Sequence, residues 1–117
     1  MKIFQPQTQL RYRNNDQGEK EFHFHSVTFF DNNSYENDGF ELTLNPDEDG
    51  FSIIKLKVKK KSNTEHNFVS PVIHDFSLGV LDEYRLFRIS VMFGDRLVGK
   101  ATHHTEDAEE DGKPIKD

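Results

Sequence analysis

Apolar and polar residues alternate with a period of two along most of this chain. That period is typical of β-strands that bury one of their two sides. No window shows the longer period of an amphipathic helix. The pattern therefore predicts an all-β fold of about seven strands, which we place in these segments: 9–13, 20–30, 40–44, 51–60, 68–78, 84–93 and 96–105.

Clusters of turn-forming residues separate these segments. The stretches 14–18, 31–39 and 45–50 are rich in Asn, Asp and Gly, which accept turn conformations. Gly94-Asp95 stands between two alternating runs and predicts a two-residue hairpin. Pro71 interrupts its segment, and since proline cannot donate to a sheet, it indicates an edge strand or a bulge.

The spacing of strands and turns is typical of an antiparallel β-sandwich. A small barrel of the OB type is the alternative. Such barrels usually have a helix between their third and fourth strands, and the corresponding region, 59–82, has no helical period. We therefore expect the sandwich, with these residues in its core: Ile54, Leu56, Val58, Phe87, Ile89 and Val91.

Length and composition limit the size of that core. The chain has 117 residues, of which 33% are hydrophobic and 31% charged, enough for one domain. We expect a β domain over 1–105 and a flexible tail over 106–117. The tail carries six acidic and two basic side chains and almost no apolar ones, so it contributes most of the net charge of −6.

The sequence excludes or disfavours several classes of protein. The chain has no cysteine, which excludes disulfides, thiolate metal sites and cysteine nucleophiles. No stretch has the length of apolar residues that a membrane span needs, and the first residues do not resemble a secretory signal. We expect a cytoplasmic protein that does not act at a membrane.

Catalytic and metal-binding motifs find little support. His23 and His25 leave the same side of one predicted strand and could share an ion, but no acidic residue follows them before Asp31. The loop 45–50 resembles the start of a calcium loop, yet Leu56 occupies the place of the final bidentate Glu. Nucleophile-elbow, phosphate-loop and zinc-protease motifs are absent. We expect neither catalytic residues, nor a metal, nor a cofactor.

The segment 51–61 carries a row of lysines on the side opposite its core residues. Basic strands that also carry aromatic side chains bind single-stranded nucleic acid through phosphate contacts and base stacking. Phe22 and Phe24, on another segment, are further candidates for stacking. Lysines on a strand also prevent aggregation between sheet edges, and this alternative stays open. The candidate residues are Phe22, Phe24, Phe51, Lys55, Lys57, Lys59 and Lys61.

Aromatic residues occur on both sides of the segment 20–30. Phe22 and Phe24 lie on one side and Phe29 on the other, so one set must be exposed or covered by something else. A second chain or a loop of the same chain would cover it. We expect a non-catalytic protein-binding module that binds itself or another protein, in the manner of small phage or plasmid inhibitors of host proteins. The alternative is a binder of single-stranded nucleic acid.

Overall fold

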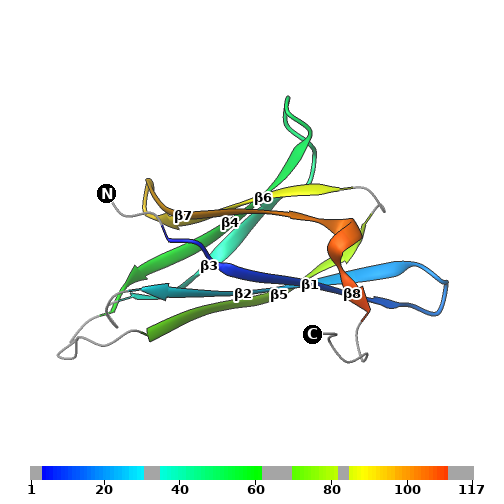
Figure 1. Cartoon of the computed structure of the whole chain (residues 1–117), viewed down its shortest axis with the longest axis horizontal. Helices are drawn as coiled ribbons and strands as arrows, with labels where there is room; N and C mark the ends of the chain where they lie inside the picture. Colours follow the sequence, from blue (N-terminus) through cyan, green and yellow to red (C-terminus); the bar gives the residue numbers. More distant parts are fainter. Residues whose placement is uncertain (1–3, 31–34, 62–69, 82–84, 111–117) are drawn as a thin grey trace.

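The chain folds as a β-sandwich of two four-stranded sheets, seen one above the other in Figure 1. This computed structural model describes residues 4–30, 35–61, 70–81 and 85–110. One sheet has the order β5-β2-β1-β8 and the other β3-β4-β6-β7. The strands are β1 (Gln7–Asn14), β2 (Lys20–Phe30), β3 (Tyr35–Thr43), β4 (Phe51–Lys60), β5 (Ser70–Val80), β6 (Leu86–Phe93), β7 (Arg96–His104) and β8 (Glu109–Glu110).

The predicted sandwich is confirmed, but its sheets are mixed rather than purely antiparallel. Strand β4 pairs with β6 in parallel, and β1 pairs with β8 in parallel. The other four pairings are antiparallel. Between β4 and β6 the chain crosses to the opposite sheet as β5 and returns, so two reversals leave β4 and β6 pointing the same way.

Alternating side chains of both sheets meet in one core. All six predicted core residues are buried, with 0–2% of their surface exposed. Phenylalanines from β2 and β5 contribute much of the remaining apolar volume. The buried apolar residues are Leu10, Phe22, Phe24, Phe30, Ile54, Leu56, Val58, Val72, Phe76, Leu78, Phe87, Ile89 and Val91.

Two predicted local features are confirmed. Gly94 and Asp95 join β6 to β7 as a two-residue turn, in which Gly94 has a positive φ of 59°. Strand β5, which contains Pro71, is an edge strand, so the missing N–H of the proline costs the sheet little.

The segment 31–39 differs from the predicted turn. Strand β3 begins at Tyr35, and its pairing with β4 is interrupted by a bulge between Asn37 and Phe40. Gly39 has a φ of 95° in this bulge, and its N–H donates to the side-chain oxygen of Asn37. The bulge therefore accommodates the Asn, Asp and Gly residues that resemble a turn, and residues 31–34 lie outside the described part.

The last described residues return to the body of the sandwich. The short 3-10 helix η1 (Thr105–Asp107) leads into β8, which pairs with Arg11 and Tyr12 of β1. Residues 106–110, which we expected in a flexible tail, thus contribute to η1 and β8, and residues 111–117 fall outside the description. None of the described residues belongs to a helix that is long and apolar enough to cross a bilayer.

Candidate functional site

The two aromatic candidates on β2 are core residues. Phe22 and Phe24 are 2% and 0% exposed, and the ring of Phe24 packs against Phe76 at 5.3 Å between centroids. The expectation that they form an exposed binding or stacking surface is therefore wrong. The alternation along β2 showed that one of its two sides is buried, but both sides carry aromatics, and the structure buries the side with Phe22.

The lysine row lies on the outer side of β4, but acidic residues of β3 accompany it. The Nζ atom of Lys57 lies 3.8 Å from a carboxylate oxygen of Glu41. The Nζ atom of Lys59 lies 3.9 Å from carboxylate oxygens of both Glu36 and Asp38. Because three acids lie beside Lys55, Lys57 and Lys59, this surface is close to electrically neutral. Lys61 follows the end of β4 and is half-buried.

Phe51, at the other end of the row, is also engaged within the chain. The guanidinium group of Arg88 lies over its ring, 4.4 Å from the centroid. Arg88 in turn pairs with Asp47 at 3.2 Å and with Asp49 at 3.7 Å. A hydrogen bond from the N–H of Phe51 is the main reason that the pKa of Asp47 is lowered. These contacts join the start of β4 to Arg88 and to the hairpin loop, so the ring of Phe51 already packs against a residue of its own chain.

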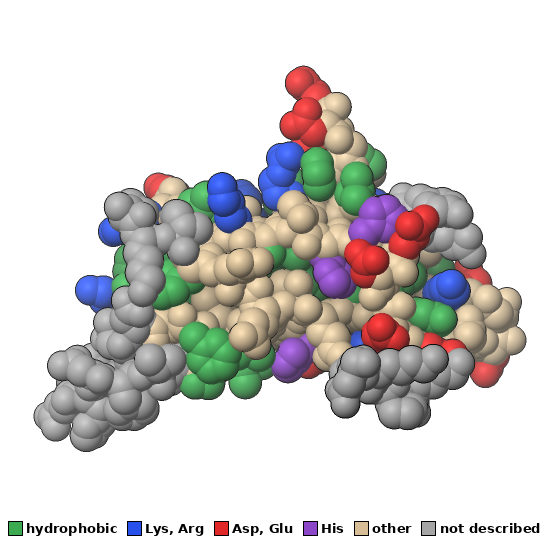
Figure 2. Space-filling model, viewed as in Figure 1, with side chains coloured by type: hydrophobic (Ala, Val, Ile, Leu, Met, Phe, Trp, Pro, Cys, Tyr) green, Lys and Arg blue, Asp and Glu red, His purple; other side chains and the backbone are tan. Residues whose placement is uncertain are grey.

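An exposed apolar surface lies on the outer side of β2 and β5 instead. Phe29 pairs with Pro71 and Val27 pairs with Ile73, so the four side chains form a two-by-two block. Phe29 is 45% and Ile73 49% exposed. Figure 2 shows apolar side chains gathered over this part of the molecule, with a histidine beside them. We call these four residues the apolar block.

Next to the apolar block, one carboxylate contacts two histidines. Asp75 of β5 stands directly opposite His25 of β2, and His25 Nδ1 lies 2.6 Å from Asp75 Oδ2. The other oxygen, Oδ1, contacts Nε2 of His23. Hydrogen bonds from His23 and then His25 lower the pKa of Asp75, so its carboxyl group is ionised at neutral pH.

The sequence did not reveal this cluster, because Asp75 lies 50 residues from His25. One feature of the sequence does mark Asp75 as unusual. Asp75 is the only acidic residue in the predicted strand 68–78, and it alternates with the apolar side chains that face the core. Only the pairing of β2 with β5 brings it to the histidines.

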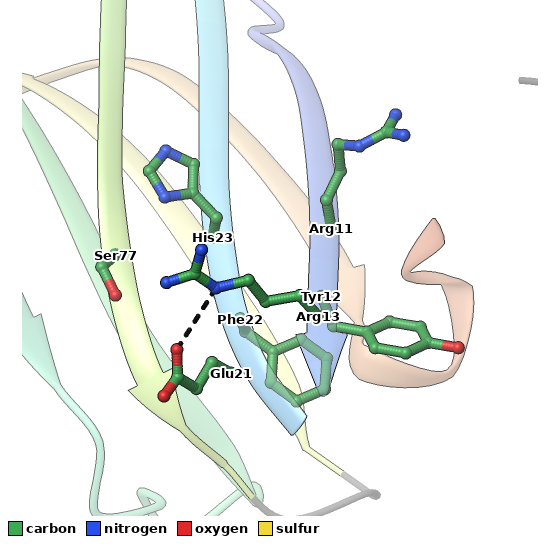
Figure 3. A pocket seen from close by; sticks show the side chains of 7 residues that line it. All are labelled: Arg11, Tyr12, Arg13, Glu21, Phe22, His23 and Ser77. Carbon is green, nitrogen blue, oxygen red and sulfur yellow. Dashed lines mark ion pairs between the residues drawn. The ribbon is translucent and has the colours of Figure 1, made fainter. Parts of the chain in front are cut away.

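Beyond the histidines, the same sheet surface carries paired charges around a shallow depression (Figure 3). Arg13 Nε lies 3.5 Å from a carboxylate oxygen of Glu21. Arg11 Nη2 donates to the carbonyl oxygen of Glu110 at 3.3 Å and extends away from His23. The depression is lined by Arg11, Tyr12, Arg13, Glu21, Phe22, His23 and Ser77.

No protein-family model, no curated protein and no solved structure matches this chain. The apolar block and the residues around it are therefore the features of this chain that point to a function.

Proposed function

We propose that this chain is a non-catalytic protein-binding module, that the apolar block is its contact surface, and that its partner is a second copy of the chain. The observation that carries this proposal is the pair of large exposed side chains, Phe29 and Ile73, on adjacent strands. Single exposed apolar residues are normal on protein surfaces, whereas contiguous ones mark contact sites.

The energetics favour covering the apolar block. Complete burial of a Phe or Ile side chain contributes about 1.5–3 kcal/mol. Stable interfaces place aromatic side chains near their centres and polar ones at the rim. The block has this composition, because the polar residues His25 and Asp75 form the next row along the same two strands.

The absence of charge in the block supports a second copy as its partner. In a twofold contact, each residue of the surface meets the same surface of the other chain, so any net charge is repelled. Val27, Phe29, Pro71 and Ile73 carry no charge that would repel. Because β5 is an edge strand, the block also reaches the rim of its sheet.

The test compares oligomeric state across variants. Light scattering over a range of concentrations should show a dimer for the full chain, and a monomer for Phe29→Ser and for Ile73→Ser. Leu97→Ser is the matched control, because Leu97 is 37% exposed on β7 of the other sheet, and it should leave the dimer intact. A monomer at all concentrations, or a dimer that survives both block substitutions, would overturn the proposal.

The nucleic-acid alternative has less support from the described contacts. Its stacking candidates Phe22 and Phe24 are buried, and acidic residues accompany Lys57 and Lys59. A single-stranded oligonucleotide of about 20 nucleotides, added in the same experiment at low salt, tests it directly. The role of an inhibitor of a host protein stays a prediction, since it needs a different partner.

A further inference from the structure

We propose that His23, His25 and Asp75 form a binding site for a divalent transition-metal ion, with Zn²⁺ as the ion that best suits them. The inference does not depend on the proposed function. It comes from the three side chains that the pairing of β2 with β5 brings together on the outer side of the sheet.

The strand geometry explains why the three donors converge. His23 and His25 are two residues apart on β2, so both imidazoles leave the same side of the sheet. Asp75 stands opposite His25 on β5, and its two oxygens contact one nitrogen of each histidine. Each histidine thus contacts a different oxygen of one carboxylate, which brings three donor side chains from two strands together.

Two imidazole nitrogens and one carboxylate oxygen are a suitable donor set for zinc. Three protein ligands leave the fourth position of a tetrahedral site open to solvent or to another ligand. Imidazole also binds copper and nickel, so selectivity among these ions is set by geometry. Ordinary calcium and magnesium sites consist of oxygen ligands, which makes these ions poor candidates.

In this structure, hydrogen bonds between Asp75 and the two histidines hold the three side chains together. As they stand here, no three His, Asp or Glu side chains among the described residues are arranged so that they could hold a metal ion. Donors around zinc lie about 3.3 Å from one another, given bond lengths near 2.0–2.1 Å. His25 Nδ1 and Asp75 Oδ2 are 2.6 Å apart, so an ion must replace the hydrogen bonds by separating the donors. The side chains are 37–49% exposed, which leaves them room to rotate.

Neighbouring groups are compatible with a cation at this position. Two arginines of β1 lie near the cluster: Arg11 pairs in register with His23 but donates to the carbonyl oxygen of Glu110, and Arg13, whose side chain reaches toward His23 in Figure 3, pairs with the carboxylate of Glu21. Ser77 stands opposite His23 and Gln9 opposite His25, so uncharged polar residues flank the cluster. The carboxylate of Asp75 is the only acidic side chain in contact with the two histidines among the described residues.

Calorimetric titration of the metal-free full chain with ZnCl₂ tests the proposal. We expect one ion per chain, and an affinity at least about tenfold weaker in each of His23→Gln, His25→Gln and Asp75→Asn. His104→Gln is the matched control, because His104 lies on β7 in the other sheet and should not affect binding. Ile73→Ser should also bind zinc normally, which separates this site from the proposed dimer contact.

A second measurement distinguishes coordination from loss of folding. Zinc should raise the melting temperature of the wild-type chain, because an ion that binds only the folded state stabilises it. The three ligand variants should fold, as shown by circular dichroism, and should not respond to zinc. The proposal is overturned by absence of binding, by equal binding in Asp75→Asn, or by binding that disappears in His104→Gln.

Discussion

The imidazole of His74 on β5 hydrogen-bonds the backbone of Lys57 on β4, with Nε2 3.0 Å from the carbonyl oxygen, and so connects the two sheets. Because a carbonyl oxygen only accepts, Nε2 carries the proton. His74 is 1% exposed, and burial is the main cause that lowers its pKa, against the opposing effect of the carbonyl groups of Lys57 and Gly39. The ring is therefore neutral in the folded chain at neutral pH.

The first prediction concerns pH. The unfolded chain protonates His74 below about pH 6.5, whereas the folded chain resists protonation, so the free energy of unfolding should fall as the pH drops through that value. Burial also lowers the pKa of His103, and its effect has the same sign. Urea denaturation at about pH 7.5 and about pH 5.5 measures the change.

His74→Gln is the informative variant for this experiment. Glutamine retains an uncharged N–H donor near the carbonyl oxygen of Lys57 but does not titrate. Its free energy of unfolding should depend less on pH than that of the wild-type chain. Equal pH dependence in both chains would show that His74 does not contribute.

The second prediction compares the two sides of β2. Phe22→Ser removes a ring that is 2% exposed and lies 5.9 Å from the ring of Tyr12, so we expect a loss of about 3–5 kcal/mol. Phe29→Ser removes a ring that is 45% exposed, and its loss should be below about 1 kcal/mol. Guanidinium denaturation at low protein concentration, where association contributes least, measures both. Similar losses would contradict the assignment of inner and outer sides.

Much of the fold follows from local pattern because each sheet buries only one of its sides. That arrangement imposes a period of two on every long strand, and the boundaries of β2 and β4 could be predicted to the residue or nearly so. The core positions Ile54, Leu56 and Val58 follow from the same alternation. The hairpin at Gly94 and the edge position of Pro71 follow from backbone preferences of single residues.

The site depends on long-range pairing, which a local pattern does not contain. Nothing near His25 in the sequence indicates that Asp75 lies opposite it. The neutralisation of Lys59 likewise depends on the bulged register of β3, which brings Glu36 and Asp38 alongside. On β2 the sequence has aromatic residues on both sides of the strand, and only packing against the second sheet decides which side faces the core.

The third prediction tests the core of β4 with a matched pair. Leu56 is fully buried, whereas its neighbour Lys55 is exposed on the outer side of the strand. Leu56→Ala should cost about 2–4 kcal/mol, because it removes apolar contacts and leaves a cavity. Lys55→Ala should change the free energy of unfolding by less than about 0.5 kcal/mol. A small effect of Leu56→Ala in urea denaturation would contradict the assigned core.

The last prediction concerns the end of the folded domain. Strand β8 pairs with β1, and the carbonyl oxygen of Glu110 accepts a hydrogen bond from Arg11. Ala108, just before β8, packs against the core. A chain that ends at residue 110 keeps all of these contacts, whereas a chain that ends at residue 105 loses them and uncovers the edge of β1.

We expect the shorter chain to be less stable than the longer one by about 1–3 kcal/mol, since each hydrogen bond contributes about 0.5–1.5 kcal/mol net. Thr105 remains in both chains, so both keep the hydrogen bond from the N–H of Arg85 to the hydroxyl oxygen of Thr105. Thermal denaturation of the two chains side by side measures the difference. Equal melting temperatures would mean that β8 does not stabilise the fold. The stable domain would then end at Thr105, which is the boundary that the composition of the sequence predicts.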